Sequence, residues 1–344
     1  MNTLSKNNYH PVLFSEEVKY PTPKPVTLYG KKYVVWRSES NNVHCLEDKC
    51  SHRSAKLSQG VVVDKCIQCP YHGWQYNKHG KCVVIPQMPK SAEGKPIPRS
   101  TKVPAFKAVD NDGIIWINTA TEDIIPFSNA SNWLNNDKYL VTDLPLTADY
   151  SYLLQIENLL DPAHIHFVHN GFQGNAQSAS HINVTNISNT DDKMSALFQH
   201  ENRNVPDLFI TFHKPYVVDV SILNKEHDIV RKNIIYVSPI ERNKCKVLFR
   251  DVVVKKFITP KNNEFMNILV NHLAKGFITQ HYQLINNKVV NSIMQQDIDV
   301  LCGQGENITT NYFDHKYIMP TESDRLIVEF RKWAKTNRDW LADV

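Results

Sequence analysis

The sequence lacks the features that mark membrane-spanning, exported or nucleic-acid-binding proteins. It has no run of about 18 apolar residues, so we expect no membrane span. Its first residues, MNTLSKNNYHPVLF, lack the apolar stretch of a secretory signal, and we therefore expect a cytoplasmic location. A formal net charge of +4 is too small to indicate nucleic acid as a partner.

The length and the residue pattern predict two domains within 344 residues. Short β-branched runs separated by turn residues fill residues 26–125 and predict a small all-β domain after a leader of residues 1–25. Residues 126–145 are polar and turn-rich, and we expect a linker there. Residues 146–344 mix helical and strand patterns, so the predicted fold class is α+β, with an antiparallel sheet and helices in the second domain. Helices are expected at about 153–169 and 262–302, and strands at about 207–222, 229–238 and 244–256.

The cysteines indicate a metal site rather than disulfides. There are seven, an odd number, and a disulfide framework is unusual in a long chain without an export signal. Cys50 and Cys69 belong to a dense group of cysteines and each has a histidine close behind it. We interpret the remaining thiols as small buried side chains without chemistry: Cys45, Cys66, Cys82, Cys245 and Cys302.

Two short strings carry the strongest signal in the sequence. Cys50-Ser51-His52 and Cys69-Pro70-Tyr71-His72 each place one thiol and one imidazole on a turn between expected strands. Two thiolates and two imidazoles are the ligands of a Rieske [2Fe–2S] cluster, in which two histidines replace two cysteines on one iron and raise its potential. A structural zinc site uses the same residue types, but such sites commonly keep like ligands paired on one knuckle or helix. We therefore predict that this cluster is bound by Cys50, His52, Cys69 and His72.

The strings around these ligands also resemble a known family. CSHR followed by CIQCPYHGWQYNKHGKCVVIPQ is similar to the Rieske domain of ring-hydroxylating-type, non-haem iron oxygenases. The continuation through GKC and IPQ resembles the branch that contains pheophorbide a oxygenase, and related cyanobacterial natural-product oxygenases. The resemblance is dense in residues 9–118, 155–170 and 290–304. The chain departs from that branch because it has no transit-like leader, C-terminal membrane helix or C-terminal C-x2-C, so a soluble bacterial relative is expected.

A second metal site is indicated by the segment NLLDPAHIHFVH at residues 158–169. A non-haem iron site needs two histidines and one carboxylate on one face of the metal. His164 and His166 point to opposite faces of a helix, and His164 and His169 converge only if the helix is kinked, widened or ends at His169. Spacing alone leaves the pairing open. The resemblance to the family pattern N-x2-D-x2-H-x4-H implies that His164 and His169 bind Fe(II) and that His166 does not.

The same pattern implies roles for two further residues. Asp161-Pro162 is a favourable helix start, with the aspartate as N-cap. The resemblance implies in addition that Asp161 hydrogen-bonds a ligand histidine and bridges toward the cluster of a neighbouring subunit. Asn158 matches the first position of the pattern, which implies a supporting role near the iron.

The carboxylate ligand must come from a distant part of the chain. Asp297 and Asp299 alternate on an expected helix, so only one of them can face a metal. The Gln-Asp pair of the family aligns with Gln296-Asp297, and the resemblance therefore selects Asp297. The alternative, in which both are surface charges and Asp251 is the ligand, stays open.

These features predict the oxygenase component of a Rieske non-haem iron enzyme. It would use O2 to oxidise, by hydroxylation, a small hydrophobic or polycyclic organic substrate, whose contacts the sequence does not identify. Phe172, Phe209, Phe212 and Tyr216 are candidates to line its pocket, but core packing explains them better. The alternatives are an electron-transfer Rieske protein without catalytic iron and a zinc-stabilised interaction protein. The second domain favours the oxygenase, because a Rieske ferredoxin would end near residue 125.

The expected partners are a ferredoxin or reductase as electron donor and further copies of the chain. Between Lys31 and Asp123 there are 14 Lys or Arg and nine Asp or Glu. A mixed, solvated surface explains this excess, and so does a basic face for an acidic donor, since charge complementarity mainly speeds encounter. The family resemblance implies a head-to-tail homotrimer, in which each cluster serves the iron of its neighbour.

Overall fold

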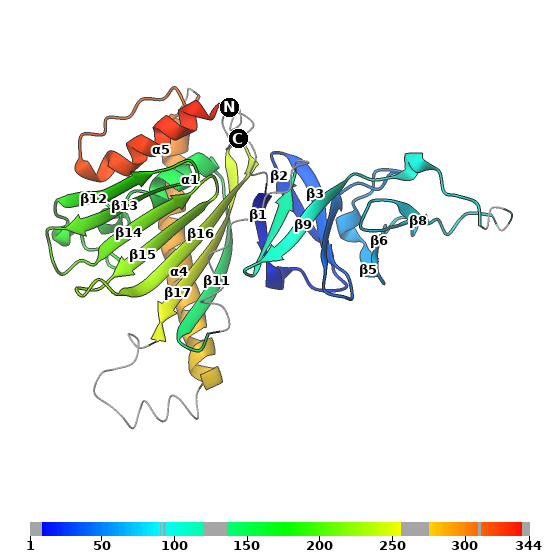
Figure 1. Ribbon diagram of the computed structural model, residues 1–344, viewed down its shortest axis with the longest axis horizontal. Coiled ribbons are helices and arrows are strands. Elements are labelled where there is room, and N and C mark those ends of the chain that lie inside the picture. Colours follow the sequence, from blue (N-terminus) through cyan, green and yellow to red (C-terminus); the bar gives the residue numbers. More distant parts are fainter. Residues whose placement is uncertain are drawn as a thin grey trace. The chain divides into compact units, whose positions relative to one another are not determined.

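The computed structural model describes residues 9–89, 91, 94–119, 136–255, 275–308 and 311–338, without the side chains of residues 275–286. The chain divides into two compact units, one of residues 5–128 and one of residues 129–344 together with residues 1–4. The first unit carries strands β1 to β10, and the second carries strands β11 to β17 and the α-helices (Figure 1).

The first unit is built from two antiparallel sheets, as the all-β prediction requires. The six-stranded sheet has the order β1-β10-β9-β4-β3-β2, and the four-stranded sheet has the order β5-β6-β7-β8. The strands of the larger sheet are β1 (Tyr9–Phe14), β2 (Lys24–Leu28), β3 (Lys31–Arg37), β4 (Val43–Glu47), β9 (Ala105–Asn111) and β10 (Ile114–Asn118). Those of the smaller sheet are β5 (Val61–Val63), β6 (Cys66–Gln68), β7 (Gln75–Tyr76) and β8 (Cys82–Val84). Single 3-10 turns lie at Ser15–Glu17, Leu57–Gln59 and Arg99–Thr101.

Strand β3 connects two cores, which explains its continuous apolar run. Successive side chains of a strand point to opposite faces. Val34 and Trp36 pack into the core that contains Cys50 and Cys69, while Val35 packs into the core on the other face. Because both faces of β3 are covered, its sequence is continuously apolar and does not alternate with polar residues.

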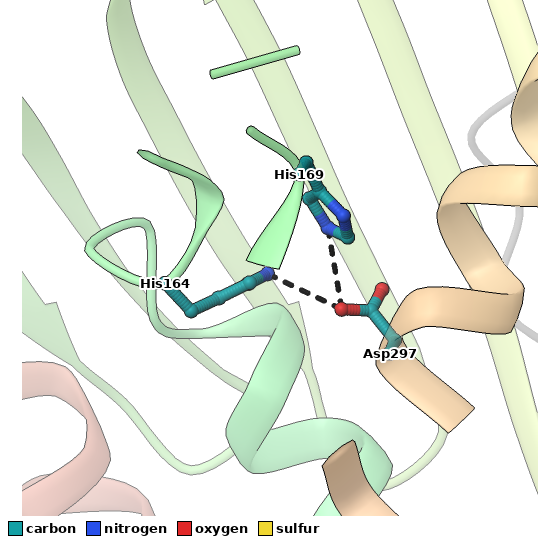
Figure 2. Close-up of side chains that lie close together, drawn as sticks. All are labelled: His164, His169 and Asp297. Atoms are coloured by element: carbon teal, nitrogen blue, oxygen red, sulfur yellow. Dashed lines mark ion pairs between the residues drawn. The ribbon is translucent and has the colours of Figure 1, made fainter. Parts of the chain in front are cut away.

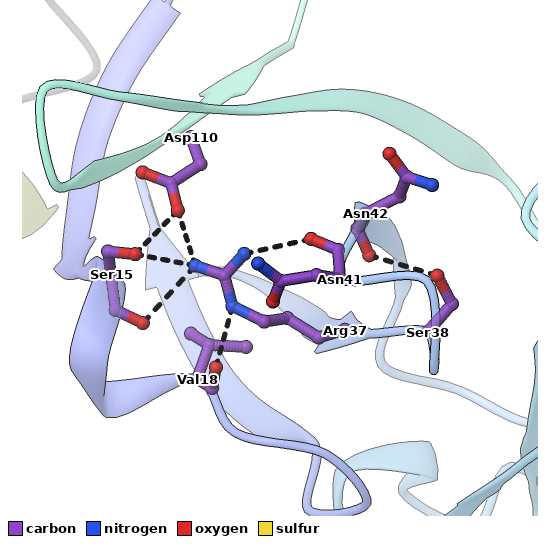
Figure 3. Close-up of polar contacts among 7 residues, drawn as sticks. All are labelled: Ser15, Val18, Arg37, Ser38, Asn41, Asn42 and Asp110. Carbon is purple, nitrogen blue, oxygen red and sulfur yellow. Dashed lines mark hydrogen bonds and ion pairs between the residues drawn. The ribbon is translucent and has the colours of Figure 1, made fainter.

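The segment predicted as a leader is part of this sheet. Strand β1 pairs with β10, and its side chains are buried in the first unit. This burial stabilises β1 as an edge strand of the sheet. The turn after β1 is held by Arg37, which is 7% exposed. Its guanidinium donates to the carbonyl of Val18 at 2.8 Å and to Oγ of Ser15 at 2.6 Å, and it pairs with Asp110 of β9 (Figure 3).

The second unit is a seven-stranded antiparallel sheet with helices, which confirms the predicted α+β class. Its strand order is β11-β17-β16-β15-β14-β13-β12. Helices α1 and α4 contact each other and strands of the sheet, and α5 contacts β12 and β13 (Figure 1). The strands are β11 (Tyr139–Ala148), β12 (Ile182–Asn189), β13 (Lys193–His200), β14 (Asp207–His213), β15 (Val217–Leu223), β16 (Ile229–Glu241) and β17 (Lys244–Val254). The helices are α1 (Tyr152–Leu159), α2 (Ile165–Val168), α4 (Lys275–Asn307) and α5 (Arg325–Thr336), with 3-10 turns at Ala176–Ser178 and Glu322–Asp324.

The structure differs from the sequence prediction at three places in this unit. The expected helix over 153–169 is broken into α1 and α2, and the expected strand over 207–222 is the hairpin of β14 and β15. Part of the expected linker, residues 139–145, belongs to β11 and pairs with β17. The expected helix over 262–302 is α4 from Lys275 onward, and residues 262–274 lie outside the described residues. Among the described residues, the structure has no helix long and apolar enough to cross a membrane.

Candidate metal centres

The four predicted cluster ligands come together on two tight turns of the first unit. After β4, the amide of Cys50 donates to the carbonyl of Ala55 at 2.8 Å, which closes the first turn. After β6, the amide of Cys69 donates to the carbonyl of Trp74 at 2.8 Å, which closes the second. Gly73 in the second turn has a φ of 73°, in the left-handed region that glycine adopts without strain. Each turn therefore presents one thiol and one imidazole from a few consecutive residues.

The thiols and imidazoles of this group differ sharply in burial. Cys50 and Cys69 are 2% and 1% exposed, whereas His52 is exposed and His72 partly so. The two imidazole rings lie 4.6 Å apart between centroids, and His52 stacks on Trp74 at 4.6 Å with nearly parallel planes. Such an arrangement suits a cluster with a buried thiolate-bound iron and an imidazole-bound iron near the surface.

The electrostatics of the thiols favour a positive partner. Burial raises the pKa of Cys69, and the neighbouring Cys50 raises it further, against the lowering effect of backbone N–H groups of Tyr71 and His72. Burial and the nearby His52 and Arg53 lower the pKa of His72, so its imidazole is neutral and able to bind a metal. Iron bound to the sulfurs would supply the positive charge that stabilises both as thiolates. The residues present therefore fit the cluster.

A second group forms in the other unit from His164, His169 and Asp297. Nε2 of His169 lies 3.2 Å from Oδ1 of Asp297, and Nε2 of His164 lies 3.6 Å from the same oxygen (Figure 2). The possible ligand atoms of the three residues all lie within 4.8 Å of one another. His169 and Asp297 are 2% and 4% exposed. Two imidazoles and one carboxylate at this spacing are the donor set of a non-haem Fe(II) site with open positions.

The break between α1 and α2 resolves the geometric problem posed by the histidine spacing. Helix α1 ends at Leu159, and Oδ1 of Asp161 accepts a hydrogen bond from the amide of Ala163 at 2.8 Å in the turn that follows. His164 then precedes the short α2 and His169 follows it. The two ligands therefore lie at opposite ends of one helical turn, where their rings converge at 5.2 Å between centroids.

The chain after His169 is packed tightly against α2. A Cβ atom at Gly174 would lie 2.2 Å from the carbonyl oxygen of Ile165, so only glycine fits at this close approach. His166 does not join the metal group. Its Nδ1 lies 3.2 Å from the carbonyl of Asn175 and its ring contacts that of His200, which gives it the packed position expected.

Two observations support a cation at the second group. Oδ1 of Asp297 is buried and has no hydrogen-bond partner among the described residues, although Nε2 of both histidines lies within 3.6 Å of it. Burial lowers the pKa of His169, but the adjacent Asp297 carboxylate, 3.2 Å from its Nε2, and the contact with Gln296 outweigh this effect and raise the pKa overall. Positive charge between the imidazoles and the carboxylate is therefore stabilised here, and Fe(II) fits the donor set.

Gln296 is a functional residue that the sequence reasoning did not assign. Its Oε1 lies 3.1 Å from Nδ1 of His169 and can only accept a hydrogen bond. This contact places the proton on Nδ1 and leaves the lone pair of Nε2 directed at Asp297 and the metal position. Ligand histidines commonly have such an orienting partner. The sequence signal was the Gln296-Asp297 pair itself, which served only to align the carboxylate.

The alternative carboxylates are engaged elsewhere. Asp299 is exposed and accepts a hydrogen bond from Gln295 at 2.8 Å. Asp251 is 1% exposed and forms an ion pair with Arg231, whose Nε lies 2.7 Å from its Oδ1. Neither belongs to the group of metal-ligand atoms that the described residues form.

Asp161 and Asn158 lie beside the second group, but Asp161 does not form the expected hydrogen bond to a ligand histidine. Oδ2 of Asp161 is 4.0 Å from Nδ1 of His164, which exceeds hydrogen-bond length. Burial raises the pKa of Asp161, although the neighbouring His164 acts in the opposite direction. Asn158 and Asp161 both line the cavity next to the metal group, which is where the predicted roles would place them.

That cavity has a volume of about 90 Å³ and mainly apolar walls. None of the aromatic candidates from the sequence lines it: Phe212 and Tyr216 are buried in the core and Phe172 is exposed. The lining residues occupy alternate positions along strands of the sheet and therefore share one face of it. Which face borders the cavity could be assigned only once the strand register was known. They include Leu208, Ile210, Val220, Ile235, Phe249 and Met294.

A Rieske-type unit joined to a unit with a two-histidine, one-carboxylate group defines the class of Rieske non-haem iron proteins. The sequence profile of the Rieske [2Fe-2S] domain matches residues 8–107, and that of the vanillate O-demethylase oxygenase C-terminal domain matches residues 148–339. The second match covers more than half of the chain, which therefore belongs to this oxygenase family. The family prediction is confirmed, and the cofactors are a Rieske [2Fe–2S] cluster and Fe(II).

The relatives include plant and bacterial proteins. Protein TIC 55, chloroplastic, from Pisum sativum is 27% identical over 94% of this chain, which spans only 57% of that protein. Methylxanthine N1-demethylase NdmA from Pseudomonas putida is 36% identical over 47% of each chain. The solved structure of NdmA from Pseudomonas putida CBB5 superposes with a TM-score of 0.72 at 22% identity, covering 96% of this chain and 90% of that one. This structural likeness shows the fold.

Proposed function

We propose that the protein is the oxygenase component of a Rieske non-haem iron enzyme. The observation that carries this proposal is the group of His164, His169 and Asp297, whose ligand atoms lie within 4.8 Å of one another in a chain that also has a Rieske domain. An electron-transfer protein has no need of a second metal group beside an apolar cavity. The reaction we propose is hydroxylation: substrate C–H, O2, two electrons and two protons give C–OH and water.

The two cofactors, when bound, supply one-electron transfer from the cluster and O2 activation at Fe(II). His164, His169 and Asp297 would hold the iron, and all three line the cavity in which a substrate would bind. Gln296 fixes the orientation of His169. Leu208, Ile210 and the other apolar side chains exclude water and hold a hydrophobic substrate beside the iron.

Electron entry is proposed at the exposed edge of the first unit. His52 and His72 lie nearest to solvent among the cluster ligands, and Lys49, Arg53 and Lys56 are exposed around the first cluster turn. This basic surface suits an acidic ferredoxin or a reductase domain as donor. We also propose that the protein is located in the cytoplasm.

We also propose a head-to-tail homotrimer in which the cluster of one subunit reduces the iron of the next. Asp161 lines the cavity beside His164 and is partly exposed, so it is available to bridge to a histidine of the neighbouring cluster. Sedimentation should give the mass of a trimer. Asp161→Asn should keep both metals and the trimer but slow oxidation of the pre-reduced cluster by O2 and substrate. A monomer with full turnover, or an Asp161→Asn variant with normal cluster oxidation, contradicts this assembly.

The reaction is tested with isotopically labelled O2 in the presence of a ferredoxin and its reductase. Candidate small apolar compounds are supplied, and the product is analysed by mass spectrometry. One labelled oxygen atom per product molecule, dependent on His169, is the expected result. Two labelled atoms would show dioxygenation, and cluster turnover without any labelled product would support the electron-transfer alternative.

A further inference from the structure

One wall of the cavity beside the iron ligands carries a buried amide. Asn233 lies on β16 and is 8% exposed. It pairs across the sheet with Val220 of β15 on one side and with Asp251 of β17 on the other. Val220 and Asn233 both line the cavity, in which most neighbouring side chains of the sheet are apolar. A polar group at this place is costly unless it has partners, so its contacts are informative.

The orientation of this amide is fixed by an ion pair behind it. Nδ2 of Asn233 donates to Oδ1 of Asp251 at 2.9 Å. Asp251 also accepts hydrogen bonds from Nε of Arg231 at 2.7 Å and from Nη2 at 3.0 Å, so two donors of the guanidinium hold its two carboxylate oxygens. A carboxylate paired in this way accepts hydrogen bonds only. The nitrogen of Asn233 must therefore face Asp251, and the amide oxygen is directed away from it.

The amide oxygen is consequently a preset acceptor for a ligand in the cavity. Among the described residues, none donates a hydrogen bond to Oδ1 of Asn233. Arg231 neutralises Asp251, so the wall offers an acceptor without attracting a cation. A substrate carboxylate would place its oxygen against the amide oxygen of Asn233, and neither atom can donate a hydrogen bond. A neutral N–H or O–H group would instead satisfy the acceptor, and a site built to bind such a group rejects analogues that lack it.

We propose that Asn233 is a specificity-determining residue that selects a neutral, hydrophobic substrate with one N–H or O–H donor, and this rests on the oxygenase function proposed for the same cavity. Asp251 and Arg231 act through it as positioning residues, because they hold the amide in the accepting orientation. The apolar walls contribute affinity for the body of the substrate, and Asn233 fixes its orientation relative to His164 and His169.

The test compares two bicyclic probes of the same shape, indole with an N–H group and indene without one. Calorimetric titration of the protein loaded with both metals measures their affinities. The wild-type protein should bind indole about tenfold more tightly than indene, as expected for one additional hydrogen bond. Asn233→Leu and Asn233→Val should bind the two probes equally. Val220→Ala, a neighbouring change that alters cavity volume without polarity, should keep the preference for indole.

Equal affinities in the wild-type protein, failure of both probes to bind, or a preference that survives in the Asn233 variants would each overturn this assignment. The two replacements keep Asp251 paired with Arg231, and the visible spectrum of the cluster and the iron content report that each variant is folded. Oxidation of indole is measured separately. Preferential binding of indole without an oxidised product argues against the oxygenase function and leaves the role of Asn233 standing.

Discussion

The two metal groups of this protein are built on opposite principles. The predicted cluster ligands lie between Cys50 and His72, on two turns that each close through local backbone hydrogen bonds. The proposed iron ligands span His164 to Asp297 and meet only because α2 and α4 lie side by side in the second unit. A locally encoded site depends on a few turns, whereas a site assembled from distant segments depends on the packing of a whole unit.

The burial of the two groups differs in the same way. His52 is exposed and His72 partly exposed, as suits the proposed entry of electrons from another protein. His169 and Asp297 are buried beside an apolar cavity, as suits a centre that must exclude water while it binds a substrate. Because the ligands belong to separate compact units, each metal should be removable without the other.

The largest effect is expected for His169→Ala. Loss of this buried ligand leaves Asp297 and His164 without the third donor. Iron affinity should therefore fall by more than about 100-fold, which is the upper limit for replacing a residue that only hydrogen-bonds a metal ligand. Turnover should disappear while the visible spectrum of the cluster persists. Metal analysis and visible absorption measure both. His166→Ala is the control, because that imidazole contacts His200 and Asn175, and it should keep its iron.

The converse change is His72→Ala. It removes one of the two imidazoles of the cluster group and should abolish the Rieske EPR signal of the reduced protein. The iron of the second unit should remain, since its ligands come from other elements. Loss of iron from both sites, measured by metal analysis of the folded variant, would show that the two groups are coupled.

A smaller effect is expected for Gln296→Leu, which removes the acceptor next to Nδ1 of His169. Iron affinity should fall by about 10- to 100-fold, the range for partners of ligand histidines. Gln296→Glu keeps an acceptor and should retain tight binding. Gln295→Leu is the matched control, because the side chain of Gln295 is exposed and donates a hydrogen bond to Asp299 instead of contacting a ligand histidine. Competition with a metal chelator measures the affinities, and equal losses in the two leucine variants would contradict an orienting role.

Tyr76→Phe should shift the potential of the cluster without removing it. The hydroxyl of Tyr76 lies 3.1 Å from Sγ of Cys50 and 2.9 Å from Oγ of Ser51. A hydrogen bond to a ligand sulfur stabilises the reduced, more negative cluster. Its loss should lower the equilibrium constant for reduction by about tenfold, which corresponds to about 59 mV for one electron. Redox titration followed by EPR measures the shift, and an unchanged or higher potential would show that the hydroxyl does not donate to the sulfur.

A last effect concerns the stability of the first unit and leaves both metal groups intact. Burial lowers the pKa of His10 to about 3, well below the value of about 6.5 in an unfolded chain. Between these values the unfolded chain binds more protons, so stability falls as pH decreases from about 6.5, by up to about 1.4 kcal/mol per pH unit. Urea unfolding at pH 7 and pH 5 measures this loss. His10→Gln should reduce it, and an equal loss in the variant would assign the acid sensitivity to other groups.

The sequence allowed the local features to be predicted and left the distant ones open. The cluster ligands could be proposed from the sequence because C-x-H and C-x2-H on turns need no knowledge of the fold. The choice of His164 with His169 required a helix break that spacing alone does not specify. Asp297 and Asp299 differ only in which face of α4 is buried, and that is decided by packing. Gln296 and Asn233 could not be assigned, because their contacts depend on strand register and on helix contacts between distant segments.

The claim that one chain carries both a Rieske cluster and a separate catalytic iron is tested most directly by EPR on a single reduced sample exposed to nitric oxide. The wild-type protein should show the Rieske signal together with an iron–nitrosyl signal, because Fe(II) held by His164, His169 and Asp297 has open positions for the probe. His169→Ala should keep the first signal and lose the second. A wild-type protein without the nitrosyl signal, or a variant that retains it, would contradict the account.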